Sequence, residues 1–168
     1  MRLAVASGKG GTGKTTVALS LAFVAAHPVM YVDCDVEEPN AHIFLRPRIT
    51  NSTVVHIPVP SVDETRCTHC GECAAVCRYG AIASLPSMTL VFKELCHGCG
   101  GCAIACPTNA ISESPNRIGV VESGPSSVLN NVTLVQGRID VGVPLSPPLI
   151  RSVKEKAGDE ELVILDCP

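Results

Sequence analysis

The chain has 168 residues and a net charge of −3, enough for one ordinary domain or one domain with a small insert. Hydrophobic residues make up 46% of the sequence but aromatic residues only 3%, so the core has to be aliphatic, as in a buried parallel sheet covered by helices. No basic stripe is visible, which argues against nucleic acid as the main partner. No apolar run approaches the ~18 residues of a membrane span, and the apolar start is too short for a signal peptide. We therefore expect a cytoplasmic protein without a membrane partner.

The first apolar runs predict a parallel strand–helix–strand unit. Residues 2–6 are predicted to form a buried strand, residues 14–26 a helix that ends before His27-Pro28, and residues 29–33 a second buried strand. Elements in this order form a crossover between two parallel strands.

Apolar runs return after a middle segment rich in Cys and Gly. Residues 118–121 and 132–135 are predicted strands, residues 145–156 a helix with prolines in its first turn, and residues 162–165 a last buried strand. The α/β pattern thus stands on both sides of an insert. We predict a discontinuous α/β domain over residues 1–57 and 116–168, and a small cysteine-rich domain over residues 58–115.

Eight of the ten cysteines stand in two runs of identical spacing, and the segments 67–83 and 96–112 align at an offset of 29 residues. In each run, C-x2-C-x2-C-x3-C, three thiolates of one loop can reach three irons of a [4Fe–4S] cube, while the fourth cysteine reaches the other cluster. The expected ligands are Cys67, Cys70, Cys73 and Cys106 for one cluster, and Cys96, Cys99, Cys102 and Cys77 for the other.

Two zinc sites with four thiolates each are the alternative for this module. Zinc sites usually pair two C-x-x-C knuckles across a longer gap, so the two complete runs favour iron–sulfur clusters. The runs resemble those of bacterial two-cluster ferredoxins, but Arg78 stands where that family usually has proline. His69 and His97 lie inside the ligand loops and are either exposed histidines or groups that tune the potential. Cys34 and Cys167, outside the runs, are interpreted as small core residues.

Residues 8–16 contain the P-loop pattern G-x4-G-K-[ST] between a predicted strand and a predicted helix. Glycines allow backbone N–H groups to turn toward phosphates, and the N-terminus of the following helix points at them. We expect Lys14 to reach the β- and γ-phosphates of ATP, Thr15 to ligate Mg²⁺ and Thr16 to assist at the α-phosphate. The other loop residues expected at the nucleotide are Gly8, Gly10, Gly11, Thr12 and Gly13.

The additional Lys9 gives the segment KGGTGKTT, which resembles the deviant Walker A box of the MinD, ParA, Mrp and nitrogenase iron-protein superfamily. The resemblance implies that Lys9 reaches the partner's phosphates in a nucleotide-sandwich homodimer. The VDCD segment resembles switch I, which implies that Asp35 orients the attacking water and Asp33 lies near Mg²⁺. The VILDCP segment resembles the Walker B strand, which implies that Asp166 holds the Mg²⁺ shell through water. Lys9, Lys14 and Asp35 are thus the candidate catalytic residues.

The resemblance is closer still to MinD-type ATPases with an inserted two-cluster ferredoxin domain, whose stretch before Walker B is similar to residues 142–151. It implies a P-loop NTPase fold with a parallel sheet and flanking helices, interrupted by a ferredoxin-like α+β insert. The implied function is an ATP-dependent switch coupled to electron transfer with an unknown redox protein. The alternative is an Mrp-like carrier for cluster assembly, but eight cysteines with full ligation favour permanent clusters.

The ATPases of this superfamily continue well beyond Walker B, whereas this chain stops at Pro168. We therefore expect a C-terminally truncated ATPase with an incomplete sheet, in which the strand at 162–165 lacks neighbours on its far side. Backbone donors and apolar surface would then be exposed there, and the nucleotide affinity of the ATPase part would be poor.

Overall fold

The structure, a computed structural model, describes residues 1–158 and 160–168. The chain divides into two compact units. Unit 1 comprises Met1–Val55, Ile118–Val141 and Ser146–Pro168, and unit 2 comprises His56–Arg117 and Gly142–Leu145. Within the described residues, no helix is long and apolar enough to cross a membrane.

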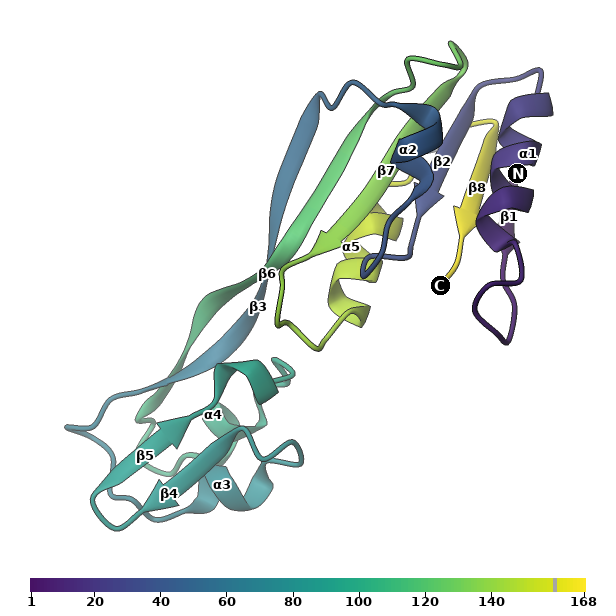
Figure 1. The fold of residues 1–168 in the computed structure, drawn as a ribbon. Helices are drawn as coiled ribbons and strands as arrows, with labels where there is room; N and C mark the ends of the chain where they lie inside the picture. The colour runs from purple at the N-terminus through teal and green to yellow at the C-terminus, as the bar shows by residue number, and fades with distance from the viewer. Residues whose placement is uncertain (159) are drawn as a thin grey trace. The chain divides into compact units, whose positions relative to one another are not determined.

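Unit 1 is built on a sheet with the strand order β1-β8-β2-β7-β6-β3 (Figure 1). β1 (Arg2–Val5), β8 (Leu162–Asp166), β2 (Val29–Asp33) and β7 (Val132–Ile139) pair in parallel in this order. The long strand β6 (Ile111–Pro125) is antiparallel to β7, and β3 (Asn51–Val62) lies beside β6. The predicted α/β fold with a mostly parallel sheet is confirmed, while the antiparallel part was not predicted.

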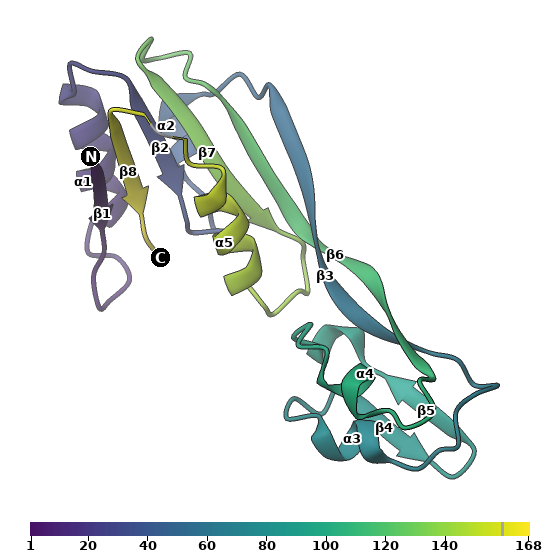
Figure 2. The ribbon, with the colours of Figure 1, turned by 180° about the vertical axis from the view of Figure 1, so that it is seen from behind.

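Helices cover both faces of this sheet. α1 (Lys14–Val24) and α2 (Ala41–Leu45) lie on one face, and α5 (Pro147–Glu155) lies on the other, as the opposite views in Figures 1 and 2 show. β2 is therefore buried at all its positions. The core under α1 and α2 is aliphatic apart from Tyr31, and consists of Ala18, Leu19, Ala22, Val29, Tyr31, Ala41, Leu45, Val132, Leu134 and Ile164.

A glycine in β7 allows α5 to pack closely on the sheet. Gly137 is buried, and a Cβ atom there would lie 2.6 Å from side-chain carbons of both Val36 and Val153. Real Cβ atoms do not approach so closely, so the missing side chain makes room for Val153 of α5.

The strands and helices predicted for unit 1 are present, most with ends shifted by a few residues, whereas β6 spans Ile111–Pro125 in place of the predicted 118–121. Two expectations are wrong. β1 is not buried: it lies at the sheet edge, and its residues are exposed or half-buried. β8 does not lack neighbours, because Ile164 pairs with Leu3 of β1 on one side and with Tyr31 of β2 on the other. Apolar composition identified both strands but could not tell an edge strand from a central one.

Unit 2 repeats one structural element twice. α3 (Glu72–Val76) and α4 (Gly101–Ala105) are short helices at equivalent positions of the two sequence repeats. Each follows a glycine in the left-handed region, Gly71 with φ of 82° and Gly100 with φ of 73°. Because L side chains rarely adopt this backbone conformation, glycine suits the turn at both places.

A two-stranded sheet and a short 3-10 turn complete unit 2. β4 (Ile82–Leu85) and β5 (Met88–Val91) form an antiparallel hairpin, and the turn spans Lys93–Leu95. A small core of Cys73, Ile82 and Ile111 packs between these elements. Cys73 is the one buried cysteine among the eight of the two runs, and Cys102 and Cys106 pack against this core as partly buried residues.

Candidate functional site

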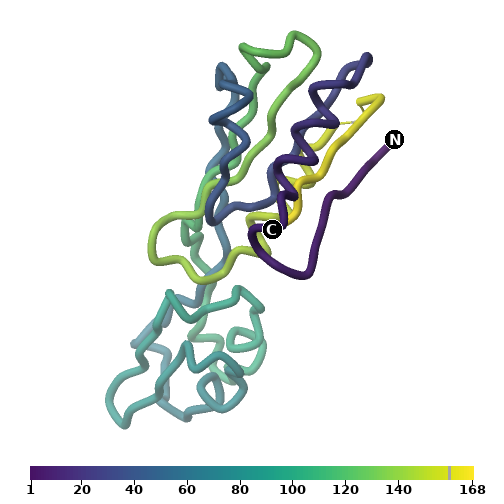
Figure 3. Tube along the Cα trace, turned by 45° about the vertical axis from the view of Figure 1, so that its right-hand side comes forward, coloured from purple at the N-terminus to yellow at the C-terminus, as the bar shows by residue number. Residues whose placement is uncertain are grey.

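The glycine-rich loop leaves β1 and turns back into α1, as the dark purple part of the trace in Figure 3 shows. Gly11 and Gly13 have φ values of 71° and 84°. The Ser7 hydroxyl is 2.8 Å from the carbonyl oxygen of Lys9, to which it donates, and 2.7 Å from the hydroxyl of Thr12. No side-chain hydrogen bond caps α1, so its first-turn N–H groups remain available to an anion.

The lysines and threonines of the predicted nucleotide site gather at this loop. Lys14 begins α1, and its Nζ atom donates to the carbonyl of Lys9 at 3.3 Å. Thr15 is half-buried, and Thr16 and Lys9 are exposed. The loop thus has the exposure and the donors that phosphate binding needs, while the individual roles of these residues stay predictions.

Asp33 and Asp166 lie side by side at the carboxyl ends of the parallel strands, the end of the sheet from which the P-loop leaves β1. They end the neighbouring parallel strands β2 and β8 and are register partners, and Val5, the last residue of β1, also pairs with Asp166. Carboxyl ends of parallel strands share one edge, which is where open α/β sheets bind ligands. Residues far apart in the sequence are therefore brought to one place, with both aspartates buried.

The Asp33 carboxylate is held by backbone N–H groups. It accepts hydrogen bonds from Asp35 at 3.1 Å and from Asn40 and Ala41 at 3.2 Å each. Burial raises the pKa of Asp33 to about 6, although the hydrogen bonds from Ala41 and Asp35 oppose this shift. Asp33 thus fastens the segment that carries Asp35, a role that was not predicted from the sequence.

Asp166 has one partnered and one unpartnered oxygen. The Tyr31 hydroxyl donates to Oδ2 of Asp166 at 2.9 Å, whereas Oδ1 is buried and has no hydrogen-bond partner among the described residues. Burial, and then the charge of Asp166, raise the pKa of Tyr31 far above its ordinary value, so the phenol stays protonated and can donate. A buried polar atom without a partner calls for a ligand or ion. Tyr31 was missed because a tyrosine in an apolar strand does not reveal its partner.

Two cavities of unit 2 are each lined by four cysteines. The first, which we call site A, has an empty volume of about 320 Å³ including space open to solvent. The second, site B, has about 420 Å³ measured in the same way. Each contains three cysteines of one run and the last cysteine of the other run: Cys67, Cys70, Cys73 and Cys106 in site A, and Cys96, Cys99, Cys102 and Cys77 in site B.

None of these eight cysteines forms a disulfide, and the surroundings of three of them shift their pKa. Burial raises the pKa of Cys73 and of Cys102. Desolvation also acts to raise the pKa of Cys106, but hydrogen bonds from the Thr108 hydroxyl and the Ala110 N–H outweigh it, so that this pKa is lowered. Donors of this kind stabilise a thiolate, the form that ligates metals.

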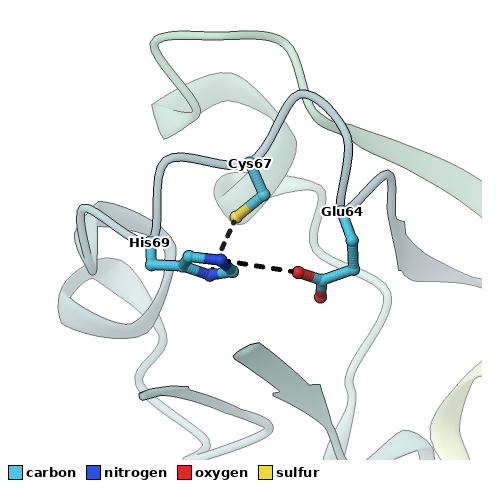
Figure 4. Close-up of side chains that lie close together, drawn as sticks. All are labelled: Glu64, Cys67 and His69. Atoms are coloured by element: carbon cyan, nitrogen blue, oxygen red, sulfur yellow. Dashed lines mark hydrogen bonds and ion pairs between the residues drawn. The ribbon is translucent and has the colours of Figure 1, made fainter. Parts of the chain in front are cut away.

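His69 and His97, the histidines of the two cysteine-rich loops, each contact other side chains. Nδ1 of His69 is 3.6 Å from the sulfur of Cys67, and its Nε2 is 3.7 Å from Oε2 of Glu64 (Figure 4). Because Cys67 also lines site A, this cluster of three side chains belongs to that site. The ring of His97 stacks on Tyr79 with ring centroids 3.6 Å apart.

Three further residues were singled out from the sequence. Arg78 is exposed. Cys34 is buried, as predicted for a small core residue, and burial raises its pKa to about 12. Cys167 is only half-buried, because it lies beyond the end of β8.

Comparison with known proteins identifies the family. The family model described as the CobQ/CobB/MinD/ParA nucleotide binding domain, CbiA, matches residues 3–154. The chain is 33% identical over 174 residues to the uncharacterized protein MJ0578 of Methanocaldococcus jannaschii, an alignment that covers all of this chain and 59% of that protein. It is 32% identical over 104 residues to the uncharacterized protein MJ0579 of the same organism, covering 57% of this chain and 36% of that protein.

The chain thus spans less than two thirds of the length of either relative. The family model covers most of it, including the P-loop, Asp33 and the segment that carries Asp35. With a glycine-rich loop at the carboxyl end of β1 and two buried aspartates at the same sheet edge, this chain belongs to the CobQ/CobB/MinD/ParA family of nucleotide-binding domains.

Proposed function

We propose that this protein binds Mg-ATP in unit 1, holds two [4Fe–4S] clusters in unit 2, and uses its nucleotide state to control electron transfer through the clusters. Membership of the family supports the nucleotide half. The observation that carries the redox half is the pair of cavities lined by four cysteines each. We further propose that the full-length protein is a homodimer and exchanges electrons with a separate redox protein.

In unit 1, each residue of the proposed nucleotide site has its own role. The Lys14 ammonium, which now rests on a loop carbonyl, moves to the β- and γ-phosphates, and the uncapped N-terminus of α1 adds positive potential there. Thr15 would hold Mg²⁺ through its hydroxyl, and Oδ1 of Asp166, which has no hydrogen-bond partner among the described residues, would hold it through a water. Asp35 orients the attacking water, and Lys9 reaches the partner's phosphates. Since the chain spans 59% of MJ0578, turnover and dimerisation are proposed for the whole protein.

In unit 2, the residues fit iron–sulfur clusters better than zinc. Zinc sites usually pair two C-x-x-C knuckles across a longer gap. Each site here instead joins three cysteines of one run to the last cysteine of the other run, as in ferredoxins with two [4Fe–4S] clusters. Backbone N–H groups of Ala81 and Ala110 also donate to the sulfurs of Cys77 and Cys106. A bound cluster supplies one-electron chemistry, and the protein's part is ligation, burial and hydrogen bonding.

A cluster carrier for apo-proteins is the second candidate, since Cys70 and Cys99 are exposed. A carrier needs a labile cluster, whereas each site here has four cysteines. Incubation of the loaded protein with an iron chelator separates the candidates. Permanent redox clusters remain bound, and a carrier loses its iron rapidly and passes it to an apo-ferredoxin.

The cluster assignment is tested by anaerobic purification and chemical analysis. We expect about eight iron and eight sulfide per chain, four of each per cluster, and visible absorbance that dithionite bleaches. Stoichiometric zinc without acid-labile sulfide would show that the assignment is wrong.

The nucleotide assignment is tested by Mg-ATP binding in a calorimeter, with Lys14→Ala as the probe. The variant should lose binding, because it removes the cation at the phosphates, while Lys93→Ala at an exposed position of unit 2 should bind as wild type does.

Control of the clusters by the nucleotide is tested by measuring the reduction potentials of the clusters with and without Mg-ATP, in a protein as long as the relatives. Identical potentials would exclude control by the nucleotide.

A further inference from the structure

In each of sites A and B, one cysteine sulfur accepts a hydrogen bond from the backbone N–H of an alanine. Ala81 donates to Cys77 of site B at 3.3 Å, and Ala110 donates to Cys106 of site A at 3.2 Å. The two alanines occupy equivalent positions of the 29-residue repeat. The repeat therefore supplies a common backbone framework, against which differences between the sites can be identified.

Side-chain donors distinguish the two sites. At site A, His69 and Thr89 lie 3.6 and 3.5 Å from the sulfur of Cys67, and the Thr108 hydroxyl lies 3.7 Å from the sulfur of Cys106. A metal-bound thiolate can only accept, so at all three contacts the side chain is the donor. Among the hydrogen bonds of the described residues, the sulfurs of site B accept from backbone N–H groups alone, those of Ala81 and Gly98.

The repeat shows why site B lacks these donors. Gly98 stands at the position equivalent to His69, and Tyr79 at the position equivalent to Thr108. His69 and Gly98 share the left-handed conformation, with φ of 54° and 65°. A side chain at Gly98 would be crowded, because its Cβ would lie 3.1 Å from the carbonyl oxygen of Pro58. The backbone is thus common to both sites, but only site A has room for the histidine.

A carboxylate stands beside each site, so negative charge does not distinguish the two. At site A, the Glu64 carboxylate lies 3.7 Å from Nε2 of His69 and within 4.8 Å of the Cys67 sulfur, and at site B Glu113 lines the cavity. The difference between the sites is therefore in the side-chain donors, of which Thr89 is buried on β5.

From these contacts we propose that the cluster of site A has the higher reduction potential of the two, because His69, Thr89 and Thr108 donate side-chain hydrogen bonds to its cysteine sulfurs. Reduction adds one negative charge that spreads onto the ligand sulfurs, and donors aimed at them stabilise this charge. The first electron supplied by a reductant therefore resides at site A. The inference rests on the proposed presence of both clusters.

The test is a potentiometric titration of the loaded protein with dithionite, followed by EPR. Wild-type protein should show two one-electron steps, with at least a tenfold preference for the first site, which corresponds to ~59 mV. Thr89→Val and Thr108→Val remove a hydroxyl at nearly constant volume, and His69→Gly reproduces the residue of site B in a backbone conformation that glycine adopts freely. Each should move the upper step to a more negative potential and leave the lower step in place.

Two controls keep a structural effect apart from hydrogen bonding. Thr65→Val makes the same chemical change where the hydroxyl donates to Asp63 at 2.7 Å, and it should move neither step. Thr89→Ser keeps a hydroxyl donor and should retain the wild-type potential. The variant that combines His69→Gly, Thr89→Val and Thr108→Val gives the deciding result. If its upper step stays in place, or its lower step moves instead, with iron and sulfide content intact, this inference alone is overturned. Absence of bound iron and sulfide overturns the proposed function and the inference together.

Discussion

The buried hydrogen bond between Tyr31 and Asp166 makes the strongest prediction about unit 1. Tyr31 is fully buried in the core between β2 and α1, and its hydroxyl donates to Oδ2 of Asp166 at 2.9 Å. The substitution Tyr31→Phe keeps the ring in place and removes the donor. Because Oδ1 of Asp166 already lacks a partner among the described residues, the variant leaves both carboxylate oxygens without one.

The magnitude follows from the charge and burial of the acceptor. A hydrogen bond to a charged group contributes about 1.5–3 kcal/mol, and a buried polar atom left without a partner costs about 1–3 kcal/mol. We therefore expect Tyr31→Phe to lower the free energy of unfolding of unit 1 by about 2–3 kcal/mol in the absence of Mg²⁺. This is a large part of the ~5–15 kcal/mol that stabilises a typical domain.

The assay is urea unfolding followed by circular dichroism, with hydrogen exchange of the peptides covering β2 and β8 to assign the loss to unit 1. The chain's other tyrosine provides the matched control, because Tyr79 is exposed and stacks on His97 through its ring. Tyr79→Phe should stay within about 0.5 kcal/mol of wild type. A Tyr31→Phe protein that is equally close to wild type would refute the idea that this bond stabilises the buried carboxylate.

Three further predictions follow from the contacts described above. Cys77→Ser should damage the cluster of site B and Cys106→Ser that of site A, and EPR spectra in which each change disturbed the other site would contradict this. Because burial raises the pKa of Asp33 to about 6, ionisation is disfavoured in the folded state. Its stabilising contribution, on the order of 3 kcal/mol, is complete below pH ~4 and lost as the pH rises through 6. Urea midpoints of Mg²⁺-free wild type should fall from pH 4 to 7 relative to Asp33→Asn, and an opposite trend would count against this. Gly137→Ala should destabilise unit 1 by about 1–3 kcal/mol, measured by thermal unfolding, because its Cβ would overlap two valine side chains.

Much of unit 1 could be predicted from local patterns. The apolar runs located β1, β2, β7 and β8, and the glycine-rich segment located the start of α1. Strand order was beyond these patterns: Leu3 and Val5 of the edge strand look as apolar as the residues of buried β2. An apolar run reports that a segment is strand-like, while burial depends on which neighbours the sheet provides.

The residues of the candidate sites also divide into those that the sequence identified and those that only the fold brings to a site. Spacing singled out the eight cysteines of sites A and B, and the P-loop pattern singled out Lys14. Thr89 was not predicted, because it lies on β5 outside both cysteine runs, and only the folded chain brings its hydroxyl close to the sulfur of Cys67. His69 and Thr108 were within reach of the sequence, because aligning the two repeats sets them against Gly98 and Tyr79. An internal repeat thus identifies its own functional differences wherever equivalent positions carry unlike side chains.

The two aspartates at the carboxyl ends of β2 and β8 are neighbours but have different hydrogen-bond partners. Asp33 accepts three backbone N–H groups, so its charge is already committed to holding the segment that carries Asp35. Asp166 accepts only the Tyr31 hydroxyl among the described residues and keeps one oxygen open. We therefore expect a cation that arrives with the nucleotide to find its free acceptor on Asp166, while Asp33 keeps the neighbouring segment in position. Resemblance to a family implies that both residues lie in the Mg²⁺ region, and the hydrogen bonds predict that Asp166 contacts the shell of the cation whereas Asp33 supports the loop.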